Sequence, residues 1–117
     1  MYSQKVLDHF HNPRNVGEIA SPTASVEATN PACGDVLKLS VAVQGGAIVE
    51  ARFKAAGCVP AIACASWLTE WLVGKPLSGL ATLTADQIEL ALDGLPLASK
   101  HAAVLAVETL RQLIVKA

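Results

Sequence analysis

The sequence predicts an α+β fold: a small antiparallel sheet of about three strands with helices packed on it. The early part of the chain carries strand patterns around a Gly-Gly pair, and the later part carries helical patterns with capping and stop signals. Strands followed by helices are typical of this fold class. The 117 residues contain no internal repeat and no linker long enough to divide them, so residues 1–117 are expected to form one domain.

Three segments are predicted as strands. The clearest is Val36–Gln44, where aliphatic side chains alternate with more polar ones, so that one face is buried. Gly45-Gly46 is a two-residue hairpin signal, and Ala47–Lys54 is the return strand. Ala24–Thr29 is a weaker strand pattern. The inward-facing residues expected on the return strand are Val49, Ala51 and Phe53.

The helices have clearer ends than the strands. An amphipathic helix is expected over Tyr2–His11, and an apolar helix over Pro60–Val73 that stops at Gly74. The capping-box sequence Thr84–Gln87 opens a short helix. Ser99 is a suitable cap for a last helix over Lys100–Val115.

Composition excludes several classes of function. Hydrophobic residues make up 52% of the chain and charged residues 16%, so a packed core is expected rather than disorder. The formal net charge is −1 and no basic run occurs, which argues against a nucleic-acid partner. No stretch is apolar for the roughly 20 residues that a membrane span needs, and no signal peptide is recognisable, so a cytoplasmic protein without a membrane partner is expected.

Cys58 lies where a predicted strand gives way to a helix that Pro60 opens. Unpaired backbone N–H groups at a helix N-terminus favour an anion, so the Cys58 thiol is expected to have a lowered pKa and to suit metal binding or attack on sulfur. The alternative is a small buried cysteine after a turn. In a reducing compartment, the three cysteines are interpreted as thiols, metal ligands or packing residues rather than disulfides.

Four residues are candidates for one metal site. Cys33 and Asp35 precede the clearest strand, Cys58 follows its hairpin partner, and His101 lies in the first turn of the last helix. The start of one strand and the end of its antiparallel partner lie at the same end of a sheet, so these residues are expected to converge there. Two thiolates, an imidazole and a carboxylate suit zinc or a mixed-ligand iron–sulfur cluster.

Each candidate also has a structural interpretation. Asp35 is a common turn residue, and His101 could donate to a carbonyl at the helix start. Cys64 is expected to pack in the core, since it lies about 120° around the helix and about 9 Å along it from Cys58. His9 and His11 are interpreted as surface or half-buried residues rather than ligands.

The same residues resemble those of the IscU/NifU N-terminal family of iron–sulfur cluster assembly scaffolds. The matching segments cover nearly the whole chain and are YSQKVLDHFHNPRNVG at the start, PACGDVLKL, ARFKAAGC and AIACASWLTEWLVGK. The resemblance implies a scaffold or carrier rather than an enzyme, which receives sulfur from a cysteine desulfurase, binds iron or a labile [2Fe–2S] cluster, and passes it to acceptor apo-proteins. It implies cofactor and metal ligands at Cys33, Asp35, Cys58 and His101, with Asp35 tuning the lability of the cluster and zinc as an alternative occupant.

The chain departs from the family pattern in two places. The family has a third cysteine after the histidine, and this chain has His101-Ala102. The family segment that a dedicated Hsp70-type chaperone recognises is Leu-Pro-Pro-Val-Lys, whereas Leu95–Ser99 keeps only its first two residues. The resemblance therefore does not extend to that chaperone. The segment before the last helix lacks the insertion of SufU-type relatives, so its length is IscU-like.

Three hypotheses remain open from the sequence. The first is a scaffold or carrier for iron–sulfur clusters. The second is a zinc-binding partner or regulator of a desulfurase, or a sulfur acceptor through Cys33 or Cys58. The third is a structural protein whose motif residues are inert. Replacing a thiolate by a carboxylate weakens affinity for soft metals, so the site is expected to bind zinc at least as well as a cluster.

Overall fold

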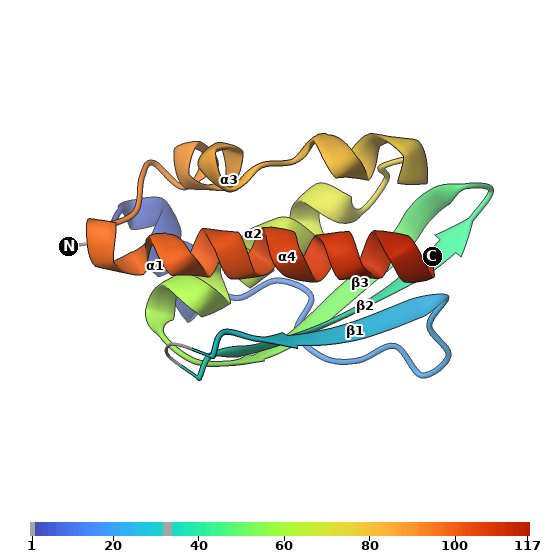
Figure 1. Ribbon diagram of the computed structural model, residues 1–117, viewed down its shortest axis with the longest axis horizontal. Helices are drawn as coiled ribbons and strands as arrows, with labels where there is room; N and C mark the ends of the chain where they lie inside the picture. The colour runs from blue at the N-terminus through green and yellow to red at the C-terminus, as the bar shows by residue number, and fades with distance from the viewer. Residues whose placement is uncertain (1, 32–33) are drawn as a thin grey trace.

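The fold is a three-stranded antiparallel sheet with two long helices on one face. A computed structural model describes residues 2–31 and 34–117. The strands β1 (Ala24–Thr29), β2 (Val36–Gln44) and β3 (Ala47–Ala56) lie in the order β1-β2-β3. The helices α2 (Val59–Leu72) and α4 (Lys100–Lys116) pack against this sheet (Figure 1). The predicted fold class is confirmed.

The β2–β3 hairpin is longer than predicted at the end away from its turn. The ladder ends on the pair Val36↔Ala56, two residues beyond the expected end of the return strand at Lys54. Asp35 and Gly57 follow this last pair directly, one on each chain segment. They therefore face each other across the end of the ladder.

The expectation that Val49 faces inward is wrong. The register shifts between Ala42 and Val43, so that Ala42 pairs with Glu50 and Val43 pairs with Ile48. A β-bulge of this kind reverses the direction of the side chains on one side of it. Ile48 is consequently buried, whereas Val49 is 47% exposed. Ala51 and Phe53 lie beyond the shift and are buried as expected.

The helices begin and end close to their predicted positions. The N-terminal helix α1 spans Gln4–His11, and α3 spans Ala85–Ala91 behind a complete capping box at Thr84. Two short 3₁₀ helices, η1 (Leu77–Thr82) and η2 (Leu97–Ser99), were not predicted. They lie in segments for which no helix or strand was predicted, and Pro76 and Pro96 precede them. Within the described residues, none of the helices combines the length and the apolar character needed to cross a bilayer.

The core lies between the sheet and the helices. Its largest fully buried aliphatic side chains come from β2, β3, α1, α2, α3, α4 and the connecting segments. Helix α4 buries its apolar stripe against β1 and β2, while α2 covers β3. This arrangement directs the N-termini of both helices towards the end of the hairpin that carries Asp35.

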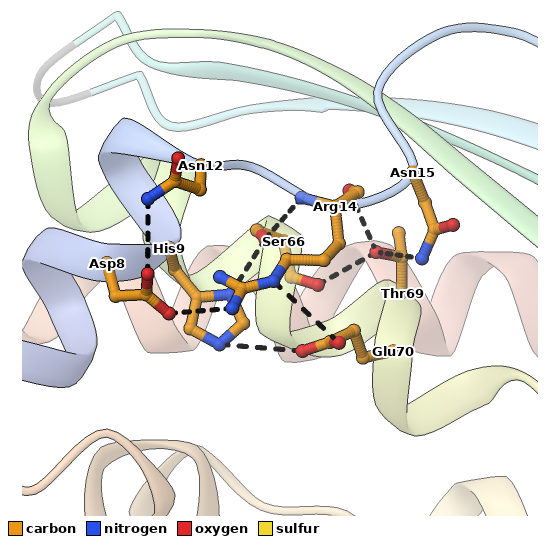
Figure 2. A network of polar contacts seen from close by, with 8 residues as sticks. All are labelled: Asp8, His9, Asn12, Arg14, Asn15, Ser66, Thr69 and Glu70. Atoms are coloured by element: carbon orange, nitrogen blue, oxygen red, sulfur yellow. Dashed lines mark hydrogen bonds and ion pairs between the residues drawn. The ribbon is translucent and has the colours of Figure 1, made fainter.

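A polar network fixes the N-terminal helix on α2 (Figure 2). The Ser66 hydroxyl is 2.7 Å from His9 Nδ1 and accepts the Arg14 backbone N–H at 2.9 Å. Glu70 lies 3.6 Å from His9 Nε2 and 3.8 Å from Arg14 Nε, and Arg14 also pairs with Asp8 at 2.6 Å. His9 is only 7% exposed, so its interpretation as a surface or half-buried residue is wrong. Its ring bridges two elements instead.

The His9 network predicts a loss of stability under mild acid. Burial lowers the pKa of His9 below its ordinary value of 6.5, and the nearby Arg14 charge adds to this, against the opposing effect of Glu70 and Asp8. The unfolded chain therefore binds a proton at His9 more readily than the folded chain. The free energy of unfolding should fall as the pH drops through about 6.5 towards the lower folded pKa.

Denaturant unfolding between pH 5 and 8 measures this effect. His9→Gln should flatten the pH dependence, because glutamine does not titrate. The matched control is His11→Gln, since His11 is exposed in the same helix, and this variant should keep the parental pH dependence. An unchanged slope in His9→Gln would contradict the assignment.

Candidate metal centre

Three of the four predicted ligands lie together at the end of the β2–β3 hairpin. The Cys58 Sγ atom is 3.3 Å from Asp35 Oδ2 and 3.8 Å from His101 Nε2. Asp35 Oδ2 and His101 Nε2 are 3.5 Å apart. One potential ligand atom from each residue lies within 4.8 Å of the other two. The expected convergence of Asp35, Cys58 and His101 is therefore observed.

The strand pattern places Asp35 on the helix-facing side. It lies two residues before Leu37 and four before Leu39, both of which are buried beneath the helices. Continuing the alternation of β2 by one step turns the Asp35 side chain the same way. Its backbone carbonyl accepts the Asn30 N–H at 2.8 Å, and the residue is only 6% exposed. A carboxylate on a mostly apolar face is thus held among potential metal ligands.

Cys58 is the N-cap residue of α2. Its backbone is extended, its carbonyl accepts the Ile62 N–H at 3.2 Å, and Pro60 occupies the first turn. The sequence placed the thiol at this helix start, and the structure agrees. The side chain makes no capping hydrogen bond, which leaves the sulfur directed to Asp35 and His101.

The pKa of Cys58 is not lowered, contrary to expectation. Burial raises the pKa of this thiol, and the Asp35 carboxylate raises it further. The backbone N–H of Ala61 at the helix start acts in the opposite direction but does not outweigh them. The thiol donates a hydrogen bond to Asp35 Oδ2. A metal ion would have to displace that proton to bind sulfur.

His101 is oriented by the backbone of the preceding turn. Its Nδ1 atom lies 3.1 Å from the Ala98 carbonyl oxygen, which can only accept a hydrogen bond. Nδ1 therefore carries a proton that it donates to this carbonyl, and Nε2 faces Asp35 and Cys58. Metal-bound histidines commonly have this arrangement, in which a second hydrogen bond fixes the ring and its tautomer. The structural role expected for His101 and a ligand role are thus compatible.

The described donor set is one sulfur, one nitrogen and one oxygen. Cys33, the fourth predicted ligand, lies outside the described residues. Ala102 occupies the position where the family pattern has its third cysteine, and it is 1% exposed and offers no donor atom. Zinc and iron both accept such mixed ligands, so the three residues fit either metal.

The remaining cysteine is separate from the site, as predicted. Cys64 is fully buried within α2, and burial raises the pKa of its thiol to about 12. Two features of the site were not recognised in the sequence: the close approach of Gly57 to Asp35 and a neighbouring hollow. For Gly57 a signal was present, because a glycine at a strand end often marks close approach of another group.

A hollow of about 410 Å³ opens beside His101. Helix α4 lines one side of it with His101, Val104, Leu105, Glu108 and Gln112, and the end of β1 with the following turn lines the other through residues 28–31. The His101 side chain is 33% exposed, whereas Asp35 is almost fully covered. The site is therefore accessible from the α4 side.

Comparison with known proteins agrees with this architecture. The profile of the NifU-like N terminal domain matches residues 1–116. Two crystal structures share the fold: a putative scaffold protein for the SUF system from Fervidobacterium islandicum AW-1, and the N-terminal part of a NifU-like protein from Brucella abortus. The first has a TM-score of 0.80 at 20% identity and covers 97% of this chain and 96% of its own. The second has a TM-score of 0.78 at 16% identity and covers 97% and 91%.

Two relatives found by sequence have a higher identity to this chain than these two structures have. The iron–sulfur cluster assembly scaffold protein IscU 1 of Archaeoglobus fulgidus is 41% identical over 115 residues, which cover 98% of this chain and 75% of the relative. The scaffold protein IscU of Escherichia coli strain K12 is 41% identical over 117 residues, which cover 97% and 91%. The chain therefore belongs to the NifU-like N terminal domain family, together with the IscU scaffold proteins of iron–sulfur cluster assembly.

Proposed function

We propose that this chain is a scaffold or carrier that holds iron or a labile [2Fe–2S] cluster at Cys33, Asp35, Cys58 and His101. The observation that carries the proposal is the convergence of three donor atoms from three separate elements within 4.8 Å. Because the chain belongs to a family that includes iron–sulfur cluster scaffold proteins, we interpret these donor atoms as ligands for iron or a cluster. The cluster is cargo, so the residues are assigned binding and release rather than a catalytic step.

The geometry suits binding that is reversible. His101 directs its Nε2 atom at the site, and the contact between Nδ1 and the Ala98 carbonyl holds the ring in place. Cys58 must lose its proton, and Asp35 lies 3.3 Å away to accept that proton or to take a ligand position itself. A carboxylate is a harder ligand than a thiolate and holds iron in a cluster less tightly. A cargo protein needs this balance, because the cluster has to leave again.

The proposed partners follow from the cargo. A cysteine desulfurase would supply the sulfur, and acceptor apo-proteins would receive the cluster. An Hsp70-type chaperone is not included, since Leu95–Ser99 lacks most of the recognition string. We place the protein in the cytoplasm, where thiol ligands stay reduced, and treat residues 1–117 as one working domain.

Cluster formation in vitro tests the ligand assignment. Anaerobic incubation with ferrous iron and sulfide should give the parent protein the visible absorption of a [2Fe–2S] cluster. Cys33→Ala and Cys58→Ala should each lose most of it, because each removes a thiolate. Cys64→Ala is the matched control, since Cys64 is buried away from the site, and it should keep the colour. A colourless parent, or equal loss in Cys64→Ala, would reject the proposal.

A second candidate function is zinc binding in a partner or regulator of a desulfurase. The specific observation in its favour is the mixed set of nitrogen, oxygen and sulfur donors, with Ala102 contributing none. Zinc accepts all three donor types in a tetrahedral site. Under this alternative, the protein would stimulate a desulfurase without assembling a cluster.

Thermal unfolding measures zinc binding directly. Free Zn²⁺ at about 100 times its dissociation constant stabilises a folded protein by about 2.7 kcal/mol, which corresponds to a rise in Tm of roughly 10 °C for a chain of this size. His101→Ala should lose most of this rise. The control is His11→Ala, at an exposed histidine, which should keep it. An equal rise in both variants would place the zinc elsewhere.

A further inference from the structure

We propose that Gly57 is a positioning residue: the absence of a side chain there is what holds the Asp35 carboxylate against Cys58 and His101. The inference rests on the proposed function, because it concerns how the chain presents one of the proposed ligands to its cargo. Gly57 donates no ligand atom. It acts by leaving the space that the carboxylate fills.

The distances show how little space there is. A Cβ atom built on Gly57 would lie 2.5 Å from Asp35 Oδ1, 2.6 Å from its Cγ and 3.1 Å from its Cβ. Directly opposed residues in an antiparallel pair normally keep their Cβ atoms about 4.5–5.5 Å apart. The two backbone segments have therefore approached more closely than a ladder with side chains on both strands allows.

The reason for glycine is space and not backbone conformation. The six glycines with a positive φ are Gly17, Gly34, Gly45, Gly46, Gly74 and Gly94. Gly57 is not among them, so an alanine could adopt its backbone angles without strain. The group that would clash is the Asp35 side chain, so its carboxylate would have to move to make room for a methyl group.

The two carboxylate oxygens of Asp35 face different neighbours. Oδ1 and the Cγ atom occupy the space that a Cβ atom on residue 57 would need. Oδ2 is thereby turned towards Cys58 Sγ at 3.3 Å and His101 Nε2 at 3.5 Å. An alanine at position 57 would displace the carboxylate from the site while leaving every proposed ligand residue in the chain.

We therefore expect two different substitutions to have the same effect on metal binding. Gly57→Ala should reproduce Asp35→Ala in metal binding, because both withdraw the same oxygen. Combining them should add little to either one, since the carboxylate can be withdrawn only once. A glycine with a merely structural role would lower stability, but its effect would add to that of Asp35→Ala.

The first measurement uses the metal-free protein. Gly57→Ala should lower Tm by about 5 °C, in the range of an overpacked site in a domain of this size. Adding Asp35→Ala should restore most of that loss, because the clashing carboxylate is gone. The matched control is Gly79→Ala, where the new Cβ would meet Pro76 at an ordinary 3.5 Å and the φ is not positive. If Gly57→Ala alone does not fold, the double variant still decides: a folded double variant supports the proposal, and an unfolded one overturns it.

The second measurement is a Co²⁺ titration followed by absorption. The parent should show a sulfur-to-cobalt charge-transfer band together with d–d bands that report the coordination geometry. Gly57→Ala should keep the charge-transfer band, change the d–d bands as Asp35→Ala does, and bind Co²⁺ about tenfold more weakly. Gly79→Ala should match the parent.

The outcomes separate this inference from the proposed function. Parental d–d bands and affinity in Gly57→Ala, or additive effects in the double variant, would overturn the role of Gly57 and leave the ligand set untouched. A parent that binds no Co²⁺ would count against the proposed function instead. In that case the melting temperatures of the metal-free variants still decide whether Gly57 positions Asp35.

Discussion

The last rung of the β2–β3 ladder is the contact on which the site depends. Val36 pairs with Ala56, and this pair sets Asp35 and Gly57 against each other just beyond the strand ends. From there the chain has one residue, Cys58, before α2 begins. The short distance along the chain leaves the thiol little freedom relative to the carboxylate. The third donor, His101, arrives from α4, whose direction is set by packing along the sheet.

Much of this arrangement could be read from the sequence. Alternation and the Gly45-Gly46 pair predict the hairpin, and antiparallel geometry then places Asp35 and Cys58 at one end of it. The position of His101 required a further assumption about the direction of the last helix, which the structure satisfies. What the sequence could not provide was the β-bulge opposite Ala42 and Val43, because the bulge leaves no local signal and reverses only the side chains of β3 between it and the hairpin turn. The error at Val49 has this cause.

The two other departures from expectation concern side-chain environment rather than secondary structure. A helix N-terminus favours a thiolate at Cys58, but the fold also buries the sulfur beside the Asp35 carboxylate. Burial and the carboxylate raise the pKa of the thiol by more than the backbone N–H groups lower it. His9 looked like a surface residue because nothing near it in sequence suggests a partner. Its partners Ser66 and Glu70 lie more than fifty positions away on α2. Both cases depend on tertiary contacts that local patterns do not encode.

The raised pKa of Cys58 and the position of Asp35 can be understood together. The Cys58 thiol donates a hydrogen bond to the Asp35 carboxylate, so both groups have a polar partner. An incoming metal ion must break that bond and release the proton, which lowers the net affinity of the site. In the proposed scaffold, the same hydrogen bond would form again when the cargo leaves and would compensate part of the lost coordination. In the proposed site the carboxylate would weaken retention of the cargo in two ways, as a hard ligand and as the alternative partner of the sulfur. In a chain where Ala102 stands in place of a further thiol, this favours a site that exchanges its cargo over one that stores it.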